Sequence, residues 1–330
     1  MNMMRCTALA ARLSLALMVI GGLLNIAHSQ TIYPTKGLRM VVPFAPGGAT
    51  DILARMSAQH LTQVWGQPVV VENKLGAGGN IGADAGAKAA ADGYTLTLAA
   101  AGFMAVNPSL YANLTYNSVT DFSPVILLVK APLLLVVNPA VQAQSLSEFI
   151  ELARRNPGKI NLGNGGTGTA QHLGGVSFSL AANIDLNHVP YKGSAPATTD
   201  LLGGIVDAQF DNMVTLVPYV KSGKLRALAV SSLQRVAAMP DVPTMAESGL
   251  PGFETGTWYG IVAPKNTPTD IVDKLNGELR KMLALPEVKE KLAAMGLEAS
   301  ANTPTEFSAL IRSEIVKYAA IVKSAKINAN

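Results

Sequence analysis

The sequence predicts an α/β fold of two α/β lobes, joined by two hinge strands with a cleft between them. Strand and helix signals alternate from Leu38 onward, and the same alternation starts again at Ser145. Two extended apolar stretches connect the two series. With 330 residues, of which 49% are hydrophobic and 15% charged, the chain can bury a core in each lobe.

The first residues predict a secretory signal. Arg12 precedes an apolar run, Leu13–Ala27, and the small residues of Ala27-His28-Ser29 stand where a signal peptidase reads. We expect a signal peptide at 1–29 and therefore a periplasmic protein. A retained membrane anchor is the alternative, but Gly21-Gly22 interrupts a run already shorter than the ~20 residues of a membrane span.

Removal of this segment would change the chemistry of the chain. It would take away Cys6, the only cysteine, so the mature chain would have no disulfide and no thiol nucleophile. It would also remove Arg5 and Arg12 and lower the net charge from +4 to +2. The remaining basic residues are scattered, so we expect no nucleic-acid partner and no membrane-embedded segment in the mature chain.

Each lobe is predicted from its own run of elements. Thr50 or Asp51 is expected to cap the first helix, because their side-chain oxygens accept from free N–H groups. In the first lobe we expect strands at 38–44, 67–73 and 94–100 and helices at 50–66 and 78–91. In the second lobe we expect helices at 145–158, 170–183 and 194–207, a strand followed by a glycine turn within 159–169, and strands at 187–193, 208–213 and 224–232.

Two connections between the lobes define their boundaries. The first is Asp121–Pro139, which Pro132 is expected to break, and the second is Glu254–Lys265. Helices from Pro268 to Ile327 are expected to pack back on the first lobe. Lobe 1 then comprises 30–130 and 256–330, and lobe 2 comprises 131–255. Such a hinge allows closure around a ligand at the carboxyl ends of the strands.

Strand-to-helix turns rich in glycine predict where an anion binds. Glycine lets the backbone approach a ligand closely, and the start of the next helix offers unpaired N–H groups and a partial positive charge. Any single turn is explained as well by chain connection alone, whereas the set in a two-lobed protein favours an anion site. The turns are "PFAPGGATD" (43–51), "NKLGAGGNIG" (73–82), "GNGGTGTAQH" (163–172) and "YKGSAPA" (191–197).

Motifs for cofactors and catalysis are not found. "GAGGNIG" fails the spacing of a dinucleotide loop, and the phosphate-loop, G-x-S-x-G and H-E-x-x-H patterns are lacking. His172 has no nucleophile partner in the sequence pattern, so we expect it to make a neutral hydrogen bond to a ligand or to its loop. Lys192 is a cation within the turn at 191–197, and Asp211 would either accept from an ammonium group or orient a loop. We expect no cofactor, no metal and no enzymatic activity.

A series of short motifs follows in order along the chain. They are "PFAPGGATD", "ENKLGAGGNIGAD", "ADGYTL", "NPSLY", "DFSPV", "LVVNP", "GTGTAQHL", "HVPYKGSAPATTDLLGG", "LRALAVSS", "PDVPTMAESGLPGFE" and "WYGIVAP". In this order the motifs resemble the Bug family, the extracytoplasmic solute receptors of tripartite tricarboxylate transporters. The resemblance runs from Tyr33 almost to the C-terminus, and it implies a type II periplasmic binding protein fold.

The resemblance also implies a ligand class and a set of contacts. Ligands would be small carboxylates, held by main-chain N–H groups and bridging waters from both lobes. Val176 departs from the acidic residue common in the family, which favours a carboxylate without an amine. The first lobe would contribute Phe44, Gly47, Gly48, Asp51, Ala101 and Gly102. The second lobe would contribute Gly168, Thr169, His172, Tyr191, Lys192, Gly193, Ser194 and Asp211.

The expected function is therefore a solute receptor that delivers a small organic carboxylate to the permease subunits of a tripartite tricarboxylate transporter. A ligand-loaded sensor with a signalling partner would have the same cleft and remains an alternative. An exported hydrolase is a second alternative, under which a change at His172 would abolish turnover and not merely weaken binding.

Overall fold

The computed structural model describes residues 33–325. The signal peptide expected at 1–29 lies outside these residues. All elements below belong to one compact unit that begins at Lys36.

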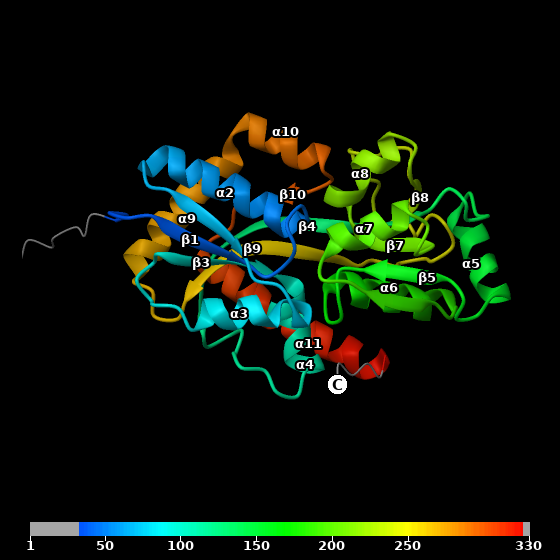
Figure 1. Ribbon diagram of the computed structural model, residues 1–330, viewed down its shortest axis with the longest axis horizontal. Coiled ribbons are helices and arrows are strands. Elements are labelled where there is room, and N and C mark those ends of the chain that lie inside the picture. Colours follow the sequence, from blue (N-terminus) through cyan, green and yellow to red (C-terminus); the bar gives the residue numbers. More distant parts are fainter. Residues whose placement is uncertain (1–32, 326–330) are drawn as a thin grey trace, which may run out of the picture. The chain divides into compact units, whose positions relative to one another are not determined.

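The strands form one continuous sheet in which parallel and antiparallel pairs are mixed (Figure 1). Its order is β2-β1-β3-β9-β4-β7-β5-β6, while β8 and β10 also pair with β4. β1 pairs in parallel with β2 and β3, as β5 does with β6 and β7. The strands are β1 (Leu38–Val42), β2 (Val69–Asn73), β3 (Thr95–Ala100), β4 (Phe122–Val137), β5 (Asn161–Asn164), β6 (Asn187–Pro190), β7 (Ala208–Asn212), β8 (Arg226–Val230), β9 (Gly256–Pro264) and β10 (Glu298–Ala299).

Strand β4 runs through both halves of this sheet. Up to Pro132 it pairs with β9, and from Leu133 onward it pairs with β7. The predicted break at Pro132 is therefore wrong, because proline fits an extended backbone and here lies opposite Gly256. Pro132 instead marks the residue at which β4 passes from one half to the other. We call the side with β1–β3, β9 and β10 the first half, and the side with β5–β8 the second half.

The chain crosses between the halves a second time after Thr255, where it enters β9. At this point the Ser231 hydroxyl donates to the Thr255 carbonyl, and the Thr255 N–H donates to the Ser231 carbonyl at 3.2 Å. The predicted lobe boundaries at residues 130/131 and 255/256 remain a proposal.

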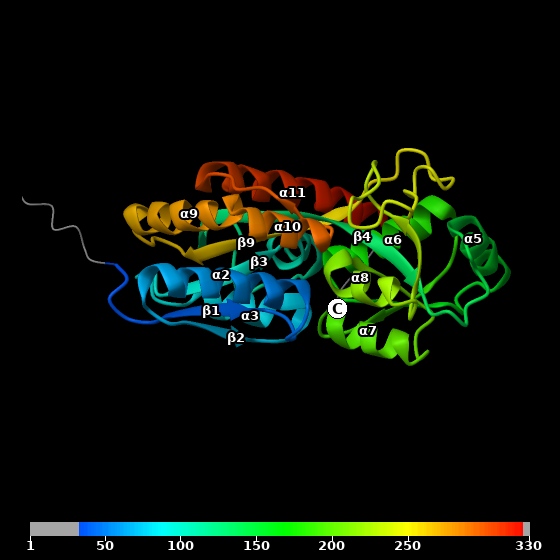
Figure 2. The same ribbon diagram turned by 90° about the horizontal axis from the view of Figure 1, so that it is seen from above.

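Helices cover both halves of the sheet (Figures 1 and 2). The C-terminal helices return to the first half, where α9 and α11 contact β4 and α9 also contacts α2. The helices are α2 (Ala49–Trp65), α3 (Asn80–Ala87), α4 (Asn107–Leu110), α5 (Leu146–Arg155), α6 (Ala170–Ala182), α7 (Ser194–Leu202), α8 (Met213–Lys221), α9 (Thr269–Ala284), α10 (Pro286–Ala294) and α11 (Pro304–Ala325), with short helical turns η1 (Ala77–Gly79) and η2 (Gly102–Val106).

The second half of the sheet is buried on both faces. Alternate residues of a strand point to opposite faces, so Leu133 and Leu135 join one apolar cluster while Leu134 and Val136 join the other. Because β4 is buried on both faces here, its residues 133–137 form a continuous apolar run in the sequence. It also fixes the strand ends from which the turns of the candidate site project.

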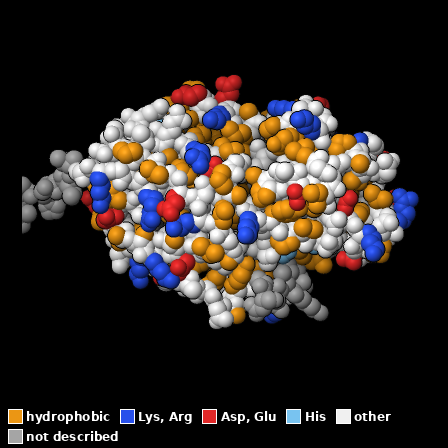
Figure 3. All heavy atoms as spheres, viewed as in Figure 1, with side chains coloured by type: hydrophobic (Ala, Val, Ile, Leu, Met, Phe, Trp, Pro, Cys, Tyr) orange, Lys and Arg blue, Asp and Glu red, His pale blue; other side chains and the backbone are white. Residues whose placement is uncertain are grey.

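None of the helices in the described part of the chain has the length and apolar character of a membrane span. On the face seen in Figure 3, basic side chains lie among acidic ones. This interspersed pattern agrees with the scattered charges of the sequence.

Candidate ligand-binding site

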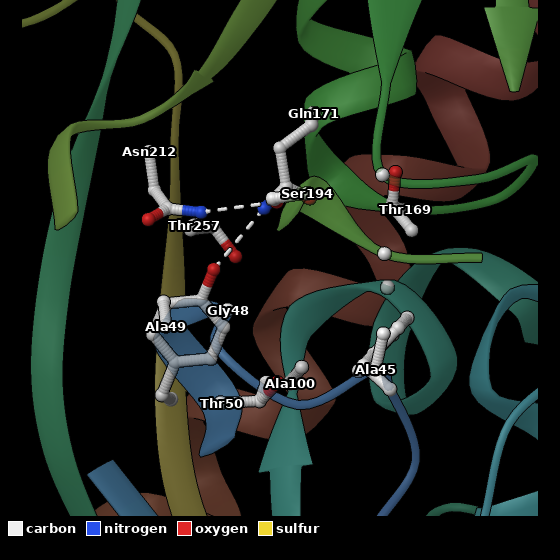
Figure 4. Close-up of a pocket in the computed structure, with 15 residues that line it drawn as sticks. Ala45, Gly48, Ala49, Thr50, Ala100, Thr169, Gln171, Ser194, Asn212 and Thr257 are labelled. Carbon is white, nitrogen blue, oxygen red and sulfur yellow. Dashed lines mark hydrogen bonds between the residues drawn. The ribbon is translucent and has the colours of Figure 1, made fainter. Parts of the chain in front are cut away.

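A small cavity lies between the two halves of the molecule (Figure 4). Its volume is about 20 Å³, which is space for one or two water molecules. In Figure 4, Gly48, Ala49 and Thr50 lie on one side of it, and Ser194 and Asn212 lie on the other. The lining residues are Phe44, Ala45, Gly48, Ala49, Thr50, Ala100, Gly102, Gly165, Thr169, Gln171, Gly193, Ser194, Asn212, Thr257 and Tyr259.

The starts of helices supply most of this lining. Gly48, Thr169, Gly193 and Asn212 are the N-cap residues of α2, α6, α7 and α8. The first N–H groups of a helix have no partner within the helix. Each helix start also carries roughly half a positive charge. The arrangement therefore favours a negatively charged group in the cavity.

The turn before α2 is held by a buried carboxylate. Asp51 accepts from the Gly47 N–H at 3.1 Å, from Arg55 Nε at 2.8 Å and from Asn73 Nδ2 at 3.1 Å. Burial raises the pKa of Asp51, but hydrogen bonds from Arg55, the Gly47 N–H and Asn73 together bring this pKa below its ordinary value. The expectation that Thr50 or Asp51 caps α2 is wrong, because the N-cap is Gly48. Asp51 instead lies in the first turn of the helix and fixes the loop through its bond to the Gly47 N–H.

The turn before α6 is held by its own hydrogen bonds. Thr169 accepts from the His172 N–H at 3.2 Å, and the Gly168 N–H donates to His172 Nδ1 at 3.4 Å. Gly168 has a φ of +80°, which glycine adopts without strain. Burial, assisted by the nearby His188, lowers the pKa of His172 to about 4. His172 is thus neutral at pH 7 and hydrogen-bonds its loop, which is one of the two roles expected for it.

A fully buried carboxylate positions two of the lining side chains. Asp211 accepts from Ser194 Oγ at 2.7 Å, from Asn212 Nδ2 at 2.7 Å and from Gln209 Nε2 at 3.1 Å. Burial raises the pKa of Asp211, and the hydrogen bond from Ser194 opposes that shift. Asp211 lies behind the cavity wall, so it orients Ser194 and Asn212.

The remaining polar side chains around the cavity are uncharged. Gln171 Nε2 donates to Tyr259 Oη at 3.1 Å, so these two side chains hold each other in place. Burial raises the pKa of Tyr259 and keeps its hydroxyl protonated. Among the described residues, no Lys, Arg or His side chain lines this cavity. Attraction for an anion would therefore come from N–H groups, hydroxyls and amides.

A second cavity, of about 250 Å³, adjoins the first one. Phe44 and Gly165 line both, so we call the 20 Å³ space the inner cavity and this one the outer cavity. The outer cavity is lined by Phe44, Gly76, Ala77, Gly78, Gly79, Tyr111, Gly165, Gly166, Thr167, Pro190, Tyr191 and Lys192.

The sequence match decides the family. Residues 53–327 match the family described as the tripartite tricarboxylate transporter family receptor. The chain belongs to this receptor family. Its members bind substrates, so this receptor is not an enzyme. The predicted Bug-family relationship is confirmed.

Similar proteins cover nearly the whole receptor. Protein BugT of Bordetella pertussis is 41% identical over 296 residues, which are 89% of this chain and 91% of BugT. A structure from R. palustris with adipate is 36% identical with a TM-score of 0.88, covering 90% of this chain and 99% of that one. MatC of Rhodopseudomonas palustris with bound malate is 34% identical with a TM-score of 0.84, covering 88% and 100%. The predicted type II periplasmic binding protein fold is confirmed.

The structure divides the receptor's predicted contact residues into three groups. Phe44, Gly48, Gly102, Thr169, Gly193 and Ser194 line the inner cavity. Tyr191 and Lys192 line the outer cavity, as Phe44 also does. The residues that line neither cavity are Gly47, Asp51, Ala101, Gly168, His172 and Asp211. All of these except Ala101 take part in the supporting hydrogen bonds described above. Val176 lines neither cavity either, so the inference about an amine gains no support from it.

Sequence reasoning missed several lining residues. Gln171 precedes the predicted contact His172, and Asn212 follows the predicted contact Asp211. For these two lining residues the predicted position was therefore wrong by one residue. Tyr259 reaches the cavity from β9, away from the glycine turns. The missed residues of the inner cavity are Ala45, Ala49, Thr50, Ala100, Gly165, Gln171, Asn212, Thr257 and Tyr259.

Proposed function

We propose that this receptor captures a small organic carboxylate in the inner cavity between its lobes. The observation that carries the proposal is the meeting of the α2, α6, α7 and α8 starts around a space that is lined only by neutral side chains among the described residues. Structures similar to the receptor were solved with adipate and with malate, which are both carboxylates. These likenesses support the same ligand class here.

The energetics of such a site are adequate. A micromolar dissociation constant corresponds to about 8 kcal/mol. A helix start contributes about 0.3–2 kcal/mol to an anion. Each hydrogen bond to a charged group contributes about 1.5–3 kcal/mol net. Two helix starts and several such hydrogen bonds reach the micromolar range without a basic side chain.

Closure would complete the site. The inner cavity holds only 20 Å³, so the halves must separate for a ligand to enter. β4 and the entry of the chain into β9 after Thr255 are the crossings about which this movement would take place. A carboxylate that contacts α2 on one side and α7 on the other would favour the closed state by its greater affinity for it.

We further propose that the loaded receptor acts in the periplasm and delivers its ligand to a tripartite tricarboxylate-type permease. The family description and similar structures that are described as periplasmic support this role. Deletion of the gene should abolish uptake of the bound acid, and the restored gene should recover it. Normal uptake together with a lost transcriptional response would favour the signalling alternative.

A thermal-shift panel tests ligand capture. Monocarboxylates, dicarboxylates and tricarboxylates are compared with their primary amides, which retain the size but lose the charge. An acid present at 100 times its dissociation constant stabilises the folded state by about 2.7 kcal/mol. We expect at least one acid to raise the melting temperature and its amide to have no effect. Stabilisation by amides or sugars, and by no acid, would overturn the proposal.

A further inference from the structure

The two halves of the molecule also touch at a place outside the inner cavity. There the loop before α6, residues 165–169 of the second half, meets the turn before α3 and the helix α4 of the first half. α4 lies within the motif "NPSLY" (107–111), none of whose residues lines the inner cavity. The proposed capture of a carboxylate therefore leaves this motif without a role.

The carbonyl group of Thr167 forms the first part of this contact. The Tyr111 hydroxyl, from the first half, donates to the Thr167 carbonyl at 3.5 Å. A Cβ atom added to Gly78, also in the first half, would overlap the same carbonyl oxygen. One main-chain carbonyl of the second half is thus enclosed by two residues of the first half, and only glycine at position 78 allows this approach.

Gly168 and Asn107 form the second part. A Cβ atom added to Gly168 would overlap Asn107 Oδ1 and would lie 3.0 Å from Leu110 Cδ2. We call the approach of Thr167 and Gly168 to Gly78, Asn107, Leu110 and Tyr111 the latch contact.

Both surfaces of the latch contact are held within their own halves. In the first half, Asn107 is fully buried, and its Nδ2 donates to Asn80 Oδ1 and to the Gly78 carbonyl at 3.4 Å. In the second half, the Thr169 hydroxyl donates to the Gly166 carbonyl at 2.8 Å. Two preformed surfaces lose little conformational freedom when they meet. The latch contact therefore stabilises the closed arrangement and is lost when the halves separate.

We propose that the latch contact stabilises closure with or without a ligand, and that Tyr111 is a positioning residue that acts through the Thr167 carbonyl. The bound receptor keeps this contact whichever acid it holds, so every acid should gain affinity by the same factor; this step rests on the proposed function. One neutral hydrogen bond corresponds to a factor of about two to ten.

Calorimetric titration with succinate, adipate and citrate tests the effect on affinity. Tyr111→Phe keeps the ring and removes the hydroxyl, so it should weaken each acid that binds by the same two- to tenfold factor. Gly78→Ala should weaken binding further, because its Cβ meets the Thr167 carbonyl. Gly223→Ala is the matched control, since Gly223 has a similar φ (+72° against +61°) but no atom within 4 Å of an added Cβ.

Three outcomes of the titration would overturn the proposal. Unchanged affinity in both Tyr111→Phe and Gly78→Ala would show that the latch contact contributes nothing to closure. A loss confined to one acid would make Tyr111 a contact of that acid. An equal loss in Gly223→Ala would assign the effect of Gly78→Ala to backbone strain.

Distances between two spin labels test the latch contact without any acid. The labels are attached at Val64→Cys and Ile205→Cys, exposed residues of opposite halves, in a Cys6→Ser background. We expect the ligand-free wild type to have a closed population that Gly78→Ala loses and Gly223→Ala keeps. Equal closed populations in the wild type and Gly78→Ala, including none in either, would overturn the proposal. If no acid binds the wild type, the proposed function fails, while these distances still decide the latch contact.

Discussion

Gly102 lines the inner cavity at a point where the two halves of the molecule are in contact. A Cβ atom added there would lie 3.0 Å from the Gly168 carbonyl oxygen and 3.0 Å from Thr169 Cα. Ordinary contacts of a Cβ begin at 3.4 Å, so the opposite backbone would have to recede by at least 3.4 − 3.0 = 0.4 Å. The substitution Gly102→Ala should therefore hinder closure of the cleft.

The size of the effect follows from that overlap. Extra methyl groups in a well-packed contact cost about 1–3 kcal/mol. If ligand binding requires the closed state, Gly102→Ala should weaken the bound acid about 5- to 150-fold. The ligand-free melting temperature should change far less, since separated lobes accommodate the methyl group.

Calorimetric titration with the most stabilising acid measures the loss, and small-angle scattering shows whether the loaded variant stays more extended than the wild type. Gly277→Ala is the matched control, because a Cβ there has no atom within 4 Å. Wild-type affinity in Gly102→Ala would refute the reasoning that the halves must meet at this distance for ligand to bind.

Further predictions concern the cavity wall and its supports. Gly48→Val should abolish acid binding in calorimetry, because the added side chain would fill the inner cavity. The circular dichroism spectrum should stay unchanged, because a Cβ at this extended residue meets only the Ala45 carbonyl oxygen, at 3.7 Å. Retained affinity would remove Gly48 from the site. Burial holds the pKa of His172 near 4, below the 6.5 of an unfolded histidine. Between these two pH values the unfolded state binds more protons than the folded state. The stability of the folded state should therefore fall as the pH drops from 6.5 toward 4. The melting temperature of His172→Asn should fall less than that of the wild type over this pH range. If both melting temperatures fall equally with pH, the loss of stability does not come from His172. Asp51→Asn should weaken acid binding about tenfold, because the turn at Gly47 loses a hydrogen bond to a charged group. An unchanged affinity in calorimetric titration would show that the turn keeps its structure without this charge.

The fold was predictable because its signals are local. Alternating strand and helix patterns placed most elements near their observed bounds, since most turns carry glycine or a capping residue. They did not predict α4 or α8, which the structure shows at Asn107–Leu110 and Met213–Lys221. Ser145 is an example, as its side chain accepts from Glu148 N–H at the start of α5. The continuity of β4 through Pro132 was not predictable from that residue alone, because it depends on the pairing with Gly256.

The candidate site was predictable in part. Gly48, Gly193 and Ser194 follow strands directly, so their place at the cavity comes from the order of elements. The direction of a side chain is set by tertiary packing, which explains why Tyr259 was missed and why Asp51 was assigned to the cap. Asp211 was expected to meet either an ammonium group or a loop, and its burial behind Ser194 could be seen only in the structure.

A crystal structure of the receptor with its most stabilising acid is the most direct measurement of the central claim. We expect carboxylate oxygens within about 3.2 Å of main-chain nitrogens at the start of α2 and, from the opposite lobe, at the start of α7. A carboxylate bound only by basic side chains outside the inner cavity, or a bound molecule without a negative charge, would contradict the account.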